Sequence, residues 1–291
     1  MLLRNQTRGT CPACGYPAAY VETVKNGRRL GWCASCQDRG AIAAILRGAG
    51  GDTHRAAEND SAAAQAAAER SRKAEQAQER ARIIWSGAAL VTADNPAGRY
   101  LIRRGLEHLT DRASLRYRDD VPHPAGGRHM ALVAAVLNAA GALVGVHRTY
   151  LHSDGSKARL EPVKASLGPI WGGAIRLAPA APEIVIGEGI ETSASAGLLL
   201  GLPAWAAISA GNLGKGVILP PEVRSVVIAA DDDGVNGQGR NPGIEASEAA
   251  AARWQREGRK VRIIKPATPG QDFNDVLLSR LANGEAAQWM T

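Results

Sequence analysis

Four cysteines, arranged as two pairs, are the residues whose spacing predicts chemistry most directly. Cys11 and Cys14 form one Cys-x-x-Cys pair, and Cys33 and Cys36 form a second pair after an interval of eighteen residues. Each pair can present two thiolates from one tight turn, so the two pairs together offer the tetrahedral all-thiolate site typical of structural Zn²⁺. Two disulfides are the alternative, which a cytoplasmic location disfavours. We therefore predict one structural zinc ion in a zinc-ribbon domain at residues 1–46.

A second group of reactive side chains consists of carboxylates that follow apolar runs. Glu188 follows the run 183–186 after one glycine, and the Asp231–Asp233 run directly follows the β-branched stretch 225–230. The carboxyl ends of parallel strands meet at one edge of a sheet, where α/β proteins place their sites. Crowded carboxylates repel one another, and a hard divalent cation such as Mg²⁺ or Mn²⁺ offsets that repulsion. We expect a catalytic metal site at this edge.

Alternation along a strand separates the three aspartates. Side chains in a strand point to opposite faces in turn, so Asp231 and Asp233 share a side and Asp232 points away. We therefore assign catalysis and Mg²⁺ binding to Glu188, Asp231 and Asp233. Two metal ions there could activate a 3′-hydroxyl and stabilise a leaving pyrophosphate. The alternative is an Asp-rich surface turn after a strand.

The elements that would position these carboxylates follow from the alternation of short β-branched runs with helical stretches. Such alternation predicts a parallel sheet in an α/β domain, which we place at residues 178–291. The expected strands are 183–186, 204–208, 225–230 and 260–264, and the expected helices are 191–200, 242–257 and 272–281.

The preceding residues predict a connector and an α+β subdomain. Residues 47–82 include a long run of Ala, Glu, Gln, Arg and Lys, which are strong helix formers, and we expect a helical or flexible connector there. Residues 83–177 open with helical patterns, the second of which closes at Gly105. Basic residues interleave with the later strands, which favours a basic groove, although ordinary surface arginines are the alternative. The expected strands are 115–118, 130–138, 143–150 and 158–163.

The overall charge favours a polyanionic partner. The chain of 291 residues has a formal net charge of +7, which suits nucleic acid or nucleotides. No stretch reaches the roughly 18 apolar residues of a membrane span, and Met1–Gln6 lacks an apolar signal segment. We therefore expect a cytoplasmic protein with no membrane partner. Trp32, beside a zinc ligand, is expected either to stack on single-stranded template or to cover the metal core.

Several motifs carry a resemblance to a known family. Gly187–Gly189 and Ala229–Gly234 resemble the Toprim signature, in which a Glu follows the first strand and an Asp-x-Asp follows the third. Glu188–Thr192, Ser209–Leu213 and Asp272–Asp275 are similar to the DnaG-like primases of phages and plasmids. The order of zinc ribbon, basic subdomain and Toprim domain also resembles that family.

The resemblance implies a DNA primase, which synthesises short RNA primers on single-stranded DNA by metal-dependent nucleotidyl transfer. It implies single-stranded DNA and ribonucleoside triphosphates as ligands, and a separate replicative helicase as a partner. Two alternatives stay open: a Toprim nuclease, and a non-catalytic DNA-binding recombination mediator that uses its zinc and Toprim domains for assembly.

The resemblance also implies roles for single residues. Glu188 would act as a general base or position a metal, Asp231 and Asp233 would hold Mg²⁺, and Asp272 would supply a further acidic ligand. The groups expected to meet template or nucleotide phosphates are Arg103, Arg148, Lys157 and Lys164.

One position departs from the family pattern. Thr192 stands where the replicative primase carries an acidic residue. The neighbouring Glu191 is a candidate substitute, and a weaker metal site is the alternative.

Overall fold

The structure is a computed structural model that describes residues 6–25, 28–48, 53–232, 234, 241–268 and 270–285, with only the backbone described for residues 6, 28, 47–48 and 53–62. Asp233, one of the predicted metal ligands, lies outside the described residues. The chain divides into two compact units, residues 1–70 and 71–291, and each is described by itself. Within the described residues, no helix is long and apolar enough to cross a membrane.

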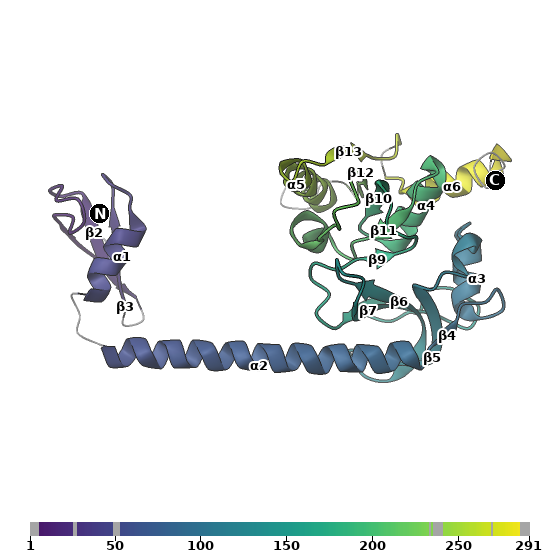
Figure 1. The fold of residues 1–291 in the computed structure, drawn as a ribbon, viewed down its shortest axis with the longest axis horizontal. Helices are drawn as coiled ribbons and strands as arrows, with labels where there is room; N and C mark the ends of the chain where they lie inside the picture. Colours follow the sequence, from purple (N-terminus) through teal and green to yellow (C-terminus); the bar gives the residue numbers. More distant parts are fainter. Residues whose placement is uncertain are drawn as a thin grey trace. The chain divides into compact units, whose positions relative to one another are not determined.

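The first unit contains a small antiparallel sheet and a short helix. Strands β1 (Gln6–Gly9), β2 (Tyr20–Lys25) and β3 (Arg28–Cys33) pair in the order β1-β2-β3, and α1 (Arg39–Gly48) packs against β3 (Figure 1). The buried residues between sheet and helix are Cys11, Tyr20, Cys33 and Ile42. A core of four side chains is small, and domains of this size usually depend on a metal or disulfides for stability.

A long helix, α2 (Thr53–Ser86), leads into the second unit. The predicted connector ends at residue 82, but the helix continues to Ser86 because its last apolar residues pack into the second unit. Its last turns are packed rather than solvated. Ala81 and Ile84 are buried against Val133 and Val146.

The second unit opens with an antiparallel sheet of order β4-β5-β6-β7-β8. Helix α3 (Pro96–Arg103) and the 3₁₀ turn η1 (Glu107–Leu109) precede most of it, and the Asn95 side chain caps α3 by accepting from the Gly98 backbone N–H. The strands are β4 (Ala89–Leu90), β5 (Leu115–Pro122), β6 (Arg128–Leu137), β7 (Leu143–Tyr150) and β8 (Lys164–Leu167). The predicted strand at 158–163 is therefore wrong. Pro162 cannot donate a ladder hydrogen bond, and pairing resumes only at Lys164.

The carboxyl-terminal sheet has the order β13-β12-β10-β11-β9, with β9 antiparallel to its neighbour and the other pairs parallel. This arrangement confirms the predicted α/β class with a parallel sheet. The strands are β9 (Ile175–Arg176), β10 (Glu183–Gly187), β11 (Ala204–Ala206), β12 (Ser225–Ala229) and β13 (Lys260–Ile264). The helices are α4 (Ile190–Leu200), the π-helical turn η2 (Asn212–Gly216), α5 (Pro242–Arg256) and α6 (Phe273–Ala282).

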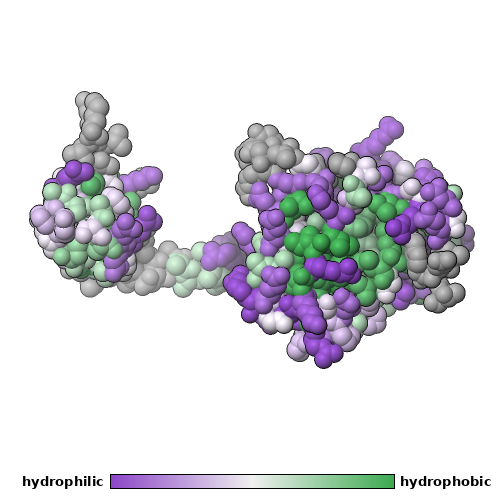
Figure 2. Space-filling view, turned by 90° about the horizontal axis from the view of Figure 1, so that it is seen from above, coloured by the Kyte–Doolittle hydropathy of each residue, from purple (hydrophilic) through white to green (hydrophobic). Residues whose placement is uncertain are grey.

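Helices cover both faces of this sheet, as alternation along the strands requires. Val185 and Val227 lie in the cluster that contains Leu277 of α6. The intervening Ile186 and Ile228 lie in the other cluster, which contains Trp254 of α5. Strands β10 and β12 are thus buried on both faces, and the carboxylates Glu188 and Asp231 follow at their carboxyl ends. The outer surface of this unit combines apolar areas with a polar surround (Figure 2).

Candidate active site and metal centre

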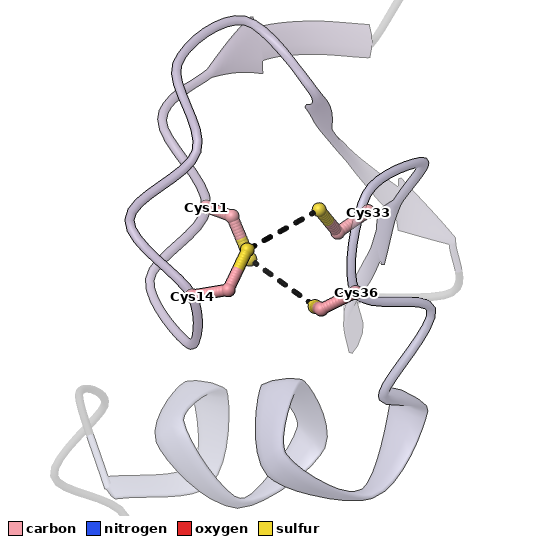
Figure 3. Close-up of side chains that lie close together, drawn as sticks. All are labelled: Cys11, Cys14, Cys33 and Cys36. Atoms are coloured by element: carbon pink, nitrogen blue, oxygen red, sulfur yellow. Dashed lines mark hydrogen bonds between the residues drawn. The ribbon is translucent and has the colours of Figure 1, made fainter.

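The four cysteines converge at one point of the first unit. Cys11 Sγ lies 3.8 Å from Cys36 Sγ, and Cys14 Sγ lies 3.8 Å from Cys33 Sγ (Figure 3). All four sulfur atoms lie within 4.8 Å of one another, and all four cysteines are free of disulfides. A tetrahedron with Zn–S bonds of about 2.3 Å has S···S edges of about 3.8 Å. The cluster therefore fits a tetrahedral metal ion, and zinc suits an all-thiolate donor set.

Trp32 lies on the exposed face of the sheet, opposite to the buried Cys33. Trp32 is 44% exposed, whereas the neighbouring Cys33 is fully buried. Trp32 pairs across the sheet with Val21, and Val21 pairs with Arg8, so the three residues share one face. This placement favours the exposed interpretation of Trp32 over the metal-covering one.

A cavity of about 200 Å³ in the second unit brings several predicted site residues together. Glu188 and Asp231 line it from the carboxyl ends of β10 and β12, which pair in parallel with Gly187 opposite Ala229. Asp272 lines it from the start of α6. Lys157 and Lys164 line the same cavity, so acidic and basic groups from distant parts of the sequence share one pocket.

The predicted separation of Asp231 from Asp232 agrees with the geometry. Asp231 lines the pocket, where the Thr192 hydroxyl donates a hydrogen bond of 2.9 Å to its Oδ1. Asp232 instead accepts from Asn241 Nδ2 at 2.7 Å and from Lys265 Nζ at 3.1 Å. The hydrogen bond from Lys265 lowers the pKa of Asp232 below its usual value. Thr192, at the position where an acid was expected, therefore contacts the predicted metal ligand Asp231.

Asp272 has a structural task besides its place in the pocket. Its side chain caps α6 by accepting from the Asp275 backbone N–H at 2.8 Å, and Asp275 Oδ2 accepts from the Asp272 backbone N–H at 3.1 Å. This reciprocal capping box satisfies two amide donors at the start of the helix. The Asp272 carboxylate is consequently held in place by the helix that it begins.

The carboxylates fit a magnesium site of the open type. Among the described residues, the four cysteines form the one group of three or more possible ligands close enough to share an ion. Glu188 and Asp231 line the pocket without forming such a closed cage. Mg²⁺ is commonly held by one or two carboxylates, with water and substrate phosphate oxygens completing its octahedron. The hard oxygen donors present here suit that mode of binding.

The two pocket lysines are paired with a buried glutamate. Glu191 is 7% exposed, and its Oε1 and Oε2 lie 2.9 and 3.0 Å from Lys164 Nζ. Lys157 Nζ lies 3.6 Å from the Oε1 atom, and the Tyr100 hydroxyl donates to the same oxygen. Burial alone would raise the pKa of Glu191, but the charge of Lys164 and the hydrogen bonds from Tyr100 and Lys164 lower it well below its usual range.

The other two residues expected to contact phosphates lie elsewhere. Arg148 is 4% exposed, and its guanidinium donates to the carbonyl oxygens of Pro122, Ala165 and Ser166. These bonds hold β7 against its neighbours and leave no exposed guanidinium for template. Arg103 is exposed and lies 3.7 Å from Asp154, and it does not line the pocket.

The sequence analysis assigned no site role to two ionisable residues that line the pocket. Arg104 lines it in place of the adjacent Arg103, and its Nη1 donates to Asn274 Oδ1 at 3.2 Å. His147 also lines it, and burial together with the charge of Lys164 lowers the pKa of His147 to about 4. The sequence shows two adjacent arginines, Arg103 and Arg104. Which of them faces the cavity depends on where α3 ends, and the sequence alone does not give this.

Comparisons with known proteins assign part of the chain to families. A Toprim domain family model matches residues 183–283, and a domain of unknown function, DUF7146, matches residues 75–177. Over 109 residues the chain is 38% identical to DNA primase TraC of Escherichia coli, which covers 35% of this chain. That match spans only 7% of the length of the relative.

Two solved structures of primases are similar to this chain. The catalytic domain of DnaG primase bound to single-stranded DNA has a TM-score of 0.48 at 13% identity, with 75% of this chain and 82% of that chain covered. The zinc-binding and RNA polymerase domains of the Aquifex aeolicus primase have a TM-score of 0.46 at 15% identity, with 98% and 80% covered. Residues 183–283 therefore match the Toprim domain family model, and part of the chain is similar in sequence to a DNA primase.

Proposed function

We propose that this protein is a DNA primase that synthesises short RNA primers on single-stranded DNA from ribonucleoside triphosphates. The observation that carries the proposal is the pocket in which Glu188 and Asp231 meet Lys157 and Lys164. Nucleotidyl transfer needs metal-binding carboxylates next to cations that bind phosphate, and this pocket contains both. The similarity to DNA primase TraC supports the same reaction.

The residues of the pocket divide the chemistry between them. Glu188, Asp231 and Asp233 would hold Mg²⁺ or Mn²⁺, and a bound ion would polarise phosphate oxygens and activate a 3′-hydroxyl. Thr192 orients the Asp231 carboxylate through its hydroxyl. Lys157, Lys164 and Arg104 would bind the phosphates of the incoming nucleotide. Neutral His147, with its Nδ1 2.9 Å from Ser166 Oγ, adds no charge to this cluster near neutral pH.

The zinc ribbon would hold template rather than catalyse. We propose that its four thiolates bind one structural zinc ion and that the exposed face with Arg8 and Trp32 contacts single-stranded DNA. An arginine beside an aromatic ring offers phosphate contact and base stacking on one surface. A separate helicase that delivers template is part of the same proposal.

The test is synthesis of oligoribonucleotides by the purified chain. Wild-type protein, single-stranded DNA, labelled ribonucleoside triphosphates and Mg²⁺ should yield short labelled products, with a replicative helicase supplied in a parallel reaction. Glu188→Gln keeps the shape of the side chain and removes its charge, so it should lower product formation by a factor of about 100 or more.

Two results would exclude the proposal. A nuclease would shorten the DNA in the presence of Mg²⁺ without incorporating label. A non-catalytic DNA-binding protein would bind the template equally well with Glu188 or with Gln at that position. It would neither incorporate label nor shorten the DNA.

A further inference from the structure

Glu191 is an acidic residue of the pocket that the roles above leave without a task. It lies on the first turn of α4, three residues after Glu188, and its carboxylate is almost fully buried. Burying a carboxylate without a partner costs much free energy, so the groups that pair with a buried carboxylate indicate its role. The partners of Glu191 come from three separate segments: Tyr100 from α3, Lys157 from the loop after β7, and Lys164 from the start of β8.

These contacts leave Glu191 poorly suited to bind metal. Both oxygens face the Lys164 ammonium, and Oε1 also accepts from Tyr100. A metal ion would have to replace three cationic or hydroxyl donors and would lie beside two ammonium groups. Asp231, in contrast, accepts a hydrogen bond from a neutral group, the Thr192 hydroxyl. Glu191 therefore does not take the place of the acidic ligand that is expected at position 192.

The same contacts fix the two lysines at the pocket wall. Lys157 and Lys164 are 36% and 32% exposed, so each ammonium keeps part of its surface toward the cavity while Glu191 holds the other side. Without a shared anion the two ammonium groups would repel each other. Burial, and after it the charge of Lys164, already lower the pKa of Lys157. A flexible lysine loses about 2 kcal/mol of rotamer freedom when it is fixed, and a preformed ion pair reduces that loss on ligand binding.

We propose that Glu191 is a positioning residue, which holds Lys157 and Lys164 in place for the triphosphate of the nucleotide and does not bind the catalytic metal. Protein kinases use a lysine–glutamate pair in the same sense, because that pair must form before the lysine can bind phosphate. The inference rests on the proposed function, since it assumes that a triphosphate enters this pocket.

The experiment measures two kinds of binding by the full chain. Calorimetric titration with the magnesium complex of inorganic tripolyphosphate reports on the lysines, and electron paramagnetic resonance of Mn²⁺ without phosphate reports on the carboxylates. Glu191→Gln should weaken tripolyphosphate binding about tenfold and leave Mn²⁺ binding within about twofold of wild type. Glu188→Gln and Asp231→Asn should instead weaken Mn²⁺ binding.

A double-mutant cycle separates positioning from a general loss of structure. Lys164→Met should weaken tripolyphosphate binding, and adding Glu191→Gln to it should weaken binding much less than in the wild-type background. Asp120→Asn is the matched control, because Asp120 is also a carboxylate held by two cations, Arg118 and Arg128, away from this pocket. It should bind both ligands like wild type. Glu191→Asp, which keeps the charge but shortens the reach, should be intermediate.

Each outcome decides between the claims. Unchanged or tighter tripolyphosphate binding by Glu191→Gln would overturn the positioning role, and so would a loss of Mn²⁺ binding in that variant. Wild-type protein that binds Mn²⁺ but no tripolyphosphate would overturn the proposed function, and the role of Glu191 with it.

Discussion

Single residues decide how the carboxylates of the pocket are used. Glu188 and Asp231 could be selected from the sequence because both follow β-branched runs whose carboxyl ends share an edge. Their neighbours could not, because nothing local shows that Thr192 contacts Asp231 or that Glu191 meets lysines. Tyr100 and Glu191 are 91 residues apart in the chain, and only the folded sheet and helices bring them together. Nor does the local sequence show that Arg148, expected to contact phosphates, is buried among backbone carbonyls.

The lowered pKa of Glu191 predicts a pH dependence of stability. Because its pKa in the folded protein lies below the ordinary value of 4.5, ionised Glu191 stabilises the fold above that pH, and this contribution is lost as the pH falls below it. Glu191→Gln lacks the contribution at every pH. The melting temperature of wild type should therefore exceed that of the variant most at neutral pH, and the gap should narrow in acid. A gap that stays constant with pH would contradict this assignment.

The four-cysteine cluster of the first unit predicts the metal content of the protein. Cys33→Ser should remove zinc from the purified chain, because it deletes one of the four ligands. Cys33 is fully buried, so no exposed side chain can take over its position as a ligand. Ser35→Ala, between the two cysteines of the same pair, should retain one zinc per chain. Elemental analysis of both variants measures this, and equal zinc content in the two would contradict a four-thiolate site.

At the scale of elements, strongly patterned segments were predictable and irregular ones were not. The strands 143–150 and 260–264 match β7 and β13, since both are β-branched runs bounded by turn residues. The wrong strand at 158–163 shows the limit of the same rule. Apolar residues do alternate along it, but Pro162 prevents regular pairing. The residues on either side of the segment, Lys157 and Lys164, line the pocket.

The π-helical turn η2 gives a prediction at the same scale. Asn212 belongs to a motif that resembles primases, but its side chain is buried and serves the fold, accepting from the Gly172 N–H and donating to the carbonyls of Gly173 and Ala207. Asn212→Ala should cost about 2–3 kcal/mol, because buried backbone groups lose their partners. Asn95→Ala, which removes the cap of α3 and an exposed hydrogen bond to the Leu90 carbonyl, should cost about 1 kcal/mol. Urea denaturation of both variants tests the order, and equal losses would contradict it.

The whole molecule consists of two units whose stability has different sources. Residues 71–291 contain the extended apolar clusters around two sheets. The described part of the first unit has a core of only four buried side chains, two of which are cysteines. The composition and cysteine spacing could predict this division into a metal-stabilised part and a larger hydrophobic part. The contacts that build the pocket depend on long-range packing within the second unit and were beyond sequence reasoning.

Removal of zinc should therefore affect one unit and spare the other. After chelation, hydrogen exchange should accelerate in β1, β2, β3 and α1, because the metal is the main support of their small core. Exchange in β10 and β12 should stay slow, since their burial does not involve the cysteines. Mass spectrometry of peptide fragments measures both. Equal acceleration in the two units would contradict their independent stabilisation.

The central claim is that Glu188 and Asp231 meet at a pocket that binds a divalent cation, and metal-directed cleavage of the chain tests it most directly. Fe²⁺ replaces Mg²⁺ at many oxygen sites and, with ascorbate and peroxide, cuts the backbone near its binding position. We predict that the cuts cluster near residues 188, 231 and 272, that excess Mg²⁺ suppresses them, and that Asp231→Asn abolishes them. Cleavage absent from these three segments, or unchanged in Asp231→Asn, would contradict it.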